Sequence, residues 1–146
     1  MMKNHPRSEP LPVLTFSLGE QPYAVAIEDV IEVASMVELT TMPDRPPHMM
    51  GIANRHGTML PVFDLRQIFE QEAAPVDSYT LFIVAAHQGQ MAGLVVDEVH
   101  QVEYLDTGER QSTAGKYIRD IVSHKGHLVQ LISLPHLLGE VLVEDR

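Results

Sequence analysis

Short runs of apolar residues, separated by turns that contain glycine or proline, occupy most of the 146-residue chain. The first run, 13–18, leads through Gly19 to a second run, 23–27, which is the spacing of a β-hairpin. Further pairs of runs flank His56-Gly57, segment 87–90 and Lys125-Gly126. Short strands at such intervals predict an all-β barrel or sandwich, and we expect barrels because a closed sheet leaves no open edge.

The hydrophobic pattern also repeats itself along the chain. Segment 52–65 returns as segment 121–134, an offset of 69 residues, with the same apolar spacing and the same turn glycine. At that offset Val25, Val30 and Val33 return as Leu94, Val99 and Val102. Two copies are too few for a solenoid, so the sequence predicts a duplicated pair of small five-stranded barrels.

Polar segments suggest the boundaries of this duplicated domain. We expect residues 1–10 to be a disordered tail and 70–78 to be a linker, because both are polar and contain proline. Residues 11–140 then form a single domain, made of subdomain 1 (about 11–72) and subdomain 2 (about 76–140). Modules of about 65 residues are marginally stable alone, so the two should share a core. Asp64 and Ser133 each predict the N-cap of a short helix after one copy.

Composition narrows the possible partners and the location. The net charge of −10 argues against nucleic acid, whose phosphates require Lys and Arg. The chain has no Cys, which excludes disulfides and thiolate catalysis and fits a reducing compartment. No apolar run approaches the length of about 18 residues that a membrane helix needs, and no signal-peptide pattern opens the chain. We therefore expect a cytoplasmic protein without membrane insertion.

Motifs for catalysis or cofactors are absent from the sequence. There is no G-x-S-x-G nucleophile and no glycine-rich phosphate loop, so we expect no enzyme, no catalytic residues and no cofactor. His124 and His127 could chelate a metal across a tight turn, but no third ligand stands at a familiar spacing. No metal site is predicted, although a small-ligand or metal-binding double barrel remains an alternative interpretation.

Two adjacent motifs resemble a known family. Segment 51–57 reads G-I-A-N-R-H-G and segment 60–66 reads L-P-V-F-D-L-R. They resemble the CheW-like family of bacterial chemosensory adaptors, whose pattern is roughly G-[VI]-x-N-x-R-G followed by [LV]-P-[VI]-x-D-L-R, and the resemblance extends over about 12–139. It implies two SH3-like barrels and a non-catalytic scaffold that couples chemoreceptor hairpin tips to the regulatory domain of a histidine kinase.

The resemblance also implies two binding surfaces. Val30, Glu32 and Val99 would lie in a receptor-binding groove between the barrels, together with Arg55 and His56. The predicted kinase-binding residues, near a barrel end, are Leu39, Met49, Met50 and Gly51.

This chain departs from the family pattern at one receptor-binding position. The family's arginine falls on His56, and the chain places Arg55 one position earlier. Since side chains alternate faces along a strand, we expect Arg55 to point away from Glu32 unless the turn is remodelled. Glu32 and His56 are then predicted to form a weaker, pH-sensitive pair. The departure leaves open a specialised member of another chemosensory pathway, such as twitching motility, with altered receptor binding.

Overall fold

Strands make up most of the computed structural model, which describes residues 10–111 and 115–142. The first copy of the repeat contains β1 (Leu11–Leu18), β2 (Gln21–Ala26), the 3-10 turn η1 (Ile27–Asp29), β3 (Val30–Ser35), β4 (Met49–Arg55), β5 (Thr58–Asp64) and helix α1 (Leu65–Ile68). The second copy contains β6 (Leu81–His87), β7 (Gln90–Val96), β8 (Glu98–Leu105), η2 (Thr107–Glu109), β9 (Arg110–Gln111), β10 (Ile118–His124), β11 (His127–Ile132) and helix α2 (Leu134–Val141). The prediction of short helices after each copy is confirmed.

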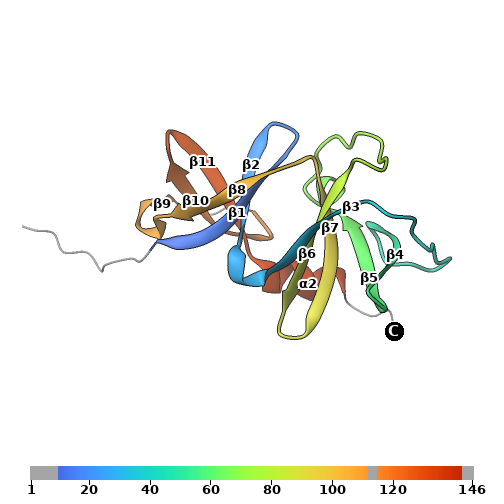
Figure 1. Cartoon of the computed structure of the whole chain (residues 1–146). Coiled ribbons are helices and arrows are strands. Elements are labelled where there is room, and N and C mark those ends of the chain that lie inside the picture. Colours follow the sequence, from blue (N-terminus) through green and yellow to red (C-terminus); the bar gives the residue numbers. More distant parts are fainter. Residues whose placement is uncertain (1–9, 112–114, 143–146) are drawn as a thin grey trace, which may run out of the picture.

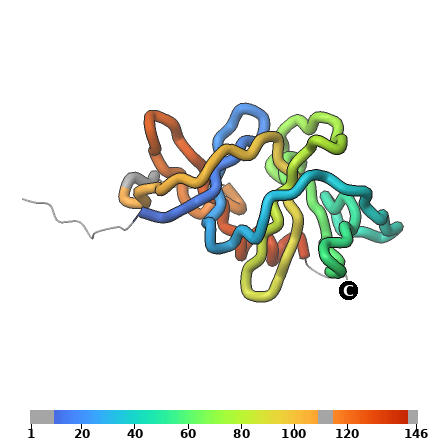
Figure 2. Tube along the Cα trace, in the orientation of Figure 1, coloured from blue at the N-terminus to red at the C-terminus, as the bar shows by residue number. Residues whose placement is uncertain are grey.

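The strands form two sheets that lie side by side (Figure 1). One sheet has the order β8-β1-β2-β11-β10-β9, and we call it the β8 barrel. The other has the order β3-β6-β7-β5-β4, and we call it the β3 barrel. The tube in Figure 2 shows that the blue and the orange-red parts of the chain lie together in the first barrel, whereas the teal to yellow part forms the second.

The two copies of the repeat exchange their first hairpins. The β1–β2 hairpin of the first copy pairs with β8 and β11 of the second copy. The β6–β7 hairpin of the second copy pairs in return with β3 and β5 of the first. The division of the chain into barrels therefore does not coincide with the expected division between about 72 and 76. Period-2 alternation specifies which face of a hairpin is buried, but not which strands it joins.

Both sheets close on themselves. In the β3 barrel, the segment after β3 reaches the outer strand β4 through two backbone hydrogen bonds between Thr40 and Ile52, of 2.9 and 2.8 Å. In the β8 barrel, the chain runs from β8 through η2 into β9, and β9 pairs with β10. The two ends of that sheet are joined in this way. Closure protects backbone groups that an open edge would leave unpaired. The predicted fold class, an all-β protein of two SH3-like barrels, is confirmed, with the two-residue β9 as an addition.

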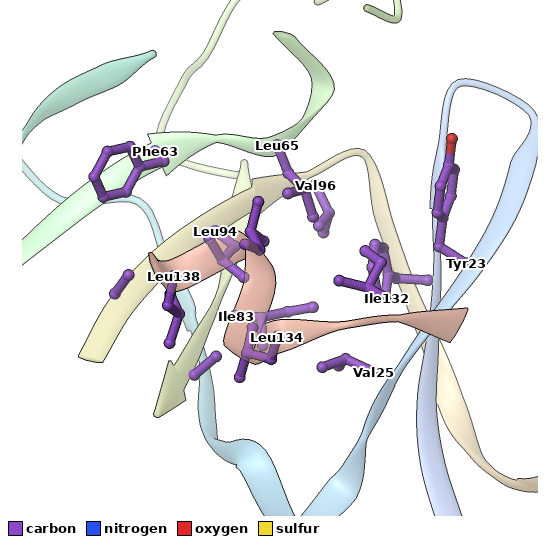
Figure 3. Packing of buried hydrophobic residues seen from close by; sticks show 14 of the residues in the cluster. Tyr23, Val25, Phe63, Leu65, Ile83, Leu94, Val96, Ile132, Leu134 and Leu138 are labelled. Atoms are coloured by element: carbon purple, nitrogen blue, oxygen red, sulfur yellow. The ribbon is translucent and has the colours of Figure 1, made fainter. Parts of the chain in front are cut away.

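The largest buried cluster lies between the barrels (Figure 3). Phe16 and Tyr23 enter it from the β8 barrel, Phe63 and Leu94 enter it from the β3 barrel, and helix α2 lies among them. Smaller clusters fill the interior of each barrel. The two barrels therefore share a core, as expected for two small modules, and α2 fills the space between them.

The two predicted helix caps differ in outcome. Asp64 is confirmed as an N-cap, since its carboxylate accepts a hydrogen bond of 3.0 Å from the backbone N–H of Arg66. Ser133 occupies the N-cap position of α2, as predicted, but its side chain makes no hydrogen bond to the backbone of the helix. The Ser133 hydroxyl lies instead 2.8 Å from Nδ1 of His136, so a side-chain partner has replaced the backbone one.

Candidate partner-binding surface

An ion pair joins β3 and β4, the two outer strands of the β3 barrel. Nε of Arg55, the last residue of β4, lies 2.5 Å from Oε2 of Glu32 on β3. Both side chains are partly exposed, at 21% and 35% respectively. Nε2 of His56 is 3.9 Å from the same oxygen, and 76% of its side chain is exposed. Arg55 is therefore the principal partner of Glu32, and His56 is a peripheral one.

This geometry corrects the expectation that Arg55 faces away from Glu32. Along β4, Ala53 is buried and Asn54 is exposed, so alternation places Arg55 on the same inner face as Ala53. Glu32 shares the corresponding face of β3 with Val30 and Ala34. Side chains do alternate along β4, but the sequence-based expectation assigned the inward-facing position to His56. In the structure that position is occupied by Arg55. His56 belongs to the turn, where its φ of 52° turns the chain back.

The apolar members of the predicted receptor site lie at the rim of the central core. Val30 begins β3 and Val99 lies near the start of β8, and both are half-buried against the cluster between the barrels. Val30 pairs with Ala85 in the β3 barrel, and Val99 pairs with Phe16 in the β8 barrel. The predicted set therefore draws residues from both barrels.

The residues predicted to bind a kinase gather where the β3 barrel closes. Met49 is 7% exposed and belongs to the central core, so its side chain packs inside the protein. Leu39 and Met50 are half-buried and pack on the interior cluster of the β3 barrel. A Cβ atom at Gly51 would lie 2.8 Å from the carbonyl oxygen of Thr40, so Gly51 permits this close approach. Only Leu39 and Met50 in this set present partly exposed side chains.

A second acid-base cluster lies on the β8 barrel. Oε1 of Glu103 on β8 lies 2.8 Å from Nε2 of His124 and 3.3 Å from Nζ of Lys125. Its Oε2 accepts a hydrogen bond of 3.0 Å from the side-chain amide (Nε2) of Gln101. Hydrogen bonds from Gln101 and His124 lower the pKa of Glu103 to about 2, with Lys125 contributing further. The internal repeat was the signal that could have located this cluster, since His124 is the counterpart of Arg55.

A buried ionic network ties the two barrels together. The guanidinium of Arg66, 2% exposed, binds both carboxylate oxygens of Asp64, at 2.9 and 3.1 Å, and one oxygen of Asp97 at 3.2 Å. Asp97 lies between β7 of one barrel and β8 of the other, and its second oxygen accepts a 2.6 Å hydrogen bond from the N–H of Gly19. Hydrogen bonding to Asp64 raises the pKa of Arg66, so the network holds a charged arginine. The D-L-R motif contains Asp64 and Arg66, but nothing local identifies Asp97.

Within residues 10–111 and 115–142, no three His, Asp or Glu side chains lie close enough together to hold a metal ion. In each charged cluster a basic side chain binds the acidic ones: Arg55 binds Glu32, His124 and Lys125 bind Glu103, and Arg66 binds Asp64 and Asp97. No helix in the same ranges is long and apolar enough to cross a membrane.

Known proteins share both the sequence pattern and the architecture. The CheW-like domain family matches residues 12–142. The chemotaxis protein CheW of Helicobacter pylori is 28% identical over 97 residues, which cover 66% of this chain and 59% of that protein, less than two thirds of its length. The probable chemotaxis protein CheW of Rhizobium etli is 27% identical over 135 residues, covering 88% and 87%. The crystal structure of the scaffolding protein TtCheW from Thermoanaerobacter tengcongensis superposes with a TM-score of 0.82 at 31% identity, covering 94% of this chain and 97% of that one.

Proposed function

The chain belongs to the CheW-like domain family, and we propose that it is a non-catalytic adaptor that couples chemoreceptors to a chemotaxis-type histidine kinase. The observation that carries this proposal is the family match over residues 12–142, nearly the whole chain. The superposition on a protein described as a scaffold supports the same function. Relatives named as chemotaxis proteins support a chemosensory pathway.

The receptor-binding surface in this proposal centres on Glu32 and Arg55. The ion pair holds two long side chains in one orientation at the closure of the β3 barrel. Val30 and Val99 add apolar contact area at the rim of the central core. A receptor helix that contacts both barrels could therefore meet a fixed charged group flanked by apolar residues, and such anchors contribute strongly to binding when desolvated.

The kinase-binding surface in this proposal uses Leu39 and Met50. Both side chains are half-buried, so a docking domain could cover them without opening the core. Met residues suit such contacts because their thioether chains adapt to the partner's shape. Gly51 acts indirectly, by letting the chain at Thr40 approach β4.

The satisfied ion pairs and the packed core between the barrels support a function without catalysis. A general acid or base works best with a pKa near the operating pH, whereas Glu103 has its pKa lowered to about 2. We place the adaptor in the cytoplasm, where the proposed kinase and receptor tips would meet it.

Binding measurements on separate partners would test this function. The purified chain should bind a chemoreceptor cytoplasmic hairpin fragment and a kinase regulatory domain, each saturably, in calorimetric titrations. Glu32→Lys reverses the charge facing Arg55 and should abolish receptor binding while leaving kinase binding intact. Glu20→Lys, in the exposed β1–β2 turn, is the matched control and should change neither. The proposal would be refuted if the unmodified chain bound neither the receptor fragment nor the kinase domain.

A further inference from the structure

The receptor-side residues of the β3 barrel have counterparts in the β8 barrel that surround one cavity. At the repeat offset of 69, Val30, Glu32, Arg55 and His56 correspond to Val99, Gln101, His124 and Lys125. All four counterparts line a cavity of about 540 Å³ at the end of the β8 barrel. The duplication has therefore produced a second surface, which shares Val99 with the receptor-binding surface of the proposed function.

The floor of this cavity is apolar and firmly held. Phe16 and Val129 are only 1% and 5% exposed, so their positions are fixed by the core behind them. Val99 and Pro22 complete the apolar lining. Phe16 also stacks on Tyr23, with ring centroids 5.9 Å apart. Phe16 and Val129 expose almost no surface themselves, so an apolar side chain would contact mainly the half-buried Val99 and Pro22 in front of them. Because this packed layer is already fixed, binding there has a low entropic cost.

The rim of the cavity carries an excess of basic groups. Lys125 and three histidines, His100, His124 and His127, face a single lining carboxylate, Glu103. That carboxylate is already satisfied by Gln101, His124 and Lys125. Just outside the lining, Glu98 lies 4.0 Å from His100. Lys125 and Glu103 balance one another in charge, and a histidine is charged only where it is protonated, so the rim offers a carboxylate N–H donors rather than a strong positive field.

The rim also differs from its counterpart in the position of its acidic residue. In the β3 barrel, Glu32 pairs directly with Arg55. In the β8 barrel the position of Glu32 is taken by Gln101, and the acid stands two residues later, at Glu103. Within the part of the chain that the structure describes, His127 has no ion-pair or hydrogen-bond partner, and 71% of the Lys125 side chain is exposed. The second surface also holds a closed acid-base cluster at Glu103, but it adds His127 and the remaining N–H donors of the exposed Lys125 ammonium.

We propose that this cavity is a second docking site, which binds an acidic segment of a protein partner through one apolar side chain in the cavity and a neighbouring carboxylate on the Lys125–His127 rim. This inference depends on the proposed function in one respect only, the receptor-binding role of the corresponding residues on the β3 barrel. The apolar floor excludes a purely ionic ligand such as inorganic phosphate as the best fit. The carboxylate of the acidic segment distinguishes this partner from the receptor helix that would contact the Glu32–Arg55 pair.

A peptide titration would test the site without receptor or kinase. The probe is the peptide acetyl-Glu-Leu-Phe-Glu-amide, added to the ¹⁵N-labelled full chain and followed by NMR. We expect saturable shifts confined to amides of segments 99–103 and 124–129. The glutamine analogue, acetyl-Gln-Leu-Phe-Gln-amide, should bind at least about fivefold more weakly, because it lacks the charges. The lysine analogue should not bind measurably.

Matched variants locate the site and control for folding. Lys125→Glu and His127→Glu, both at exposed positions, should each weaken binding of the acidic peptide at least about fivefold. The thermal midpoint should stay unchanged in His127→Glu, whereas Lys125→Glu should also lower it because a new carboxylate faces Glu103. His56→Glu, the counterpart of the Lys125 variant on the β3 barrel, should leave peptide binding intact. Equal binding of the three peptides, shifts confined to the β3 barrel, or insensitivity to both rim variants would each overturn the proposal. Because neither physiological partner takes part, failure here leaves the adaptor function untouched.

Discussion

Arg55 and Glu32 join strands that stand at opposite ends of the β3 sheet, with Nε and Oε2 2.5 Å apart. The pair forms only because the barrel closes through Thr40 and Ile52. His56, adjacent in sequence, is mostly exposed and lies 3.9 Å from the same carboxylate. The charged group at this surface is therefore an arginine displaced by one position along the chain.

Arg55 should matter more than His56 for receptor binding. We expect Arg55→Ala to weaken binding of a receptor hairpin fragment about fivefold, because it removes a charged group of the proposed surface and the partner that orients Glu32. His56→Ala should change affinity less than twofold. Isothermal titration calorimetry on both variants makes the comparison, and a larger effect from His56→Ala would restore the predicted Glu32–His56 pair.

Arg66 should be among the most sensitive positions for stability. Replacing it by Met leaves the carboxylates of Asp64 and Asp97 without their cation, and Asp64 is 3% exposed. Loss of one partner from a buried network costs about 3–5 kcal/mol. Urea denaturation of Arg66→Met measures this cost. Arg119→Met is the control, because Arg119 is half-exposed and pairs with Asp120 at the surface, so the loss should stay below about 1 kcal/mol.

Glu103 should make stability depend on pH in the acidic range. Its pKa is lowered from 4.5 to about 2 in the folded protein. A lowered carboxyl pKa stabilises the folded state above pH 4.5, and this contribution is lost as the pH falls toward 2. Glu103→Gln removes the titrating group. The free energy of unfolding should therefore fall less steeply below pH 4.5 in the variant, and identical slopes in both proteins would contradict the assignment.

Two glycines offer a matched test of close packing. A Cβ at Gly51 would lie 2.8 Å from the Thr40 oxygen and 2.9 Å from Cβ of Leu39, so Gly51→Ala should destabilise the fold by about 1–3 kcal/mol. Nothing lies within 4 Å of a Cβ at Gly139 inside α2. Gly139→Ala should therefore stabilise by up to about 1 kcal/mol. Thermal unfolding of both variants gives the sign of each change in stability. A change of the same sign in both variants would contradict the close packing of Gly51 against Thr40.

Helix α2 should couple the unfolding of the two barrels. Leu138 is fully buried in the cluster that both barrels share, so Leu138→Ala should cost about 2–5 kcal/mol. Because residues from both barrels surround it, amides of β2 and β6 should lose hydrogen-exchange protection together. Protection lost in one barrel alone would show that the barrels unfold independently.

Local chemistry explains the part of the fold that could be predicted from the sequence. The turns at His56-Gly57 and Lys125-Gly126 were predicted correctly, and all four residues have positive φ values, which such two-residue hairpins require. Alternation of apolar residues predicted the strands, and the Asp64 carboxylate predicted the start of α1. Each of these features depends on residues within a few positions of one another, so the chain carries the information directly.

Contacts between distant residues account for what the sequence pattern missed. The β1–β2 and β6–β7 hairpins have equivalent apolar faces, so alternation could not show that each pairs with strands of the other copy. Closure of the barrels then determined that Arg55 meets Glu32 and that His124 meets Glu103. Pairing of strands far apart in the chain depends on the total burial and hydrogen bonding of the assembled sheets, which no local window of sequence contains.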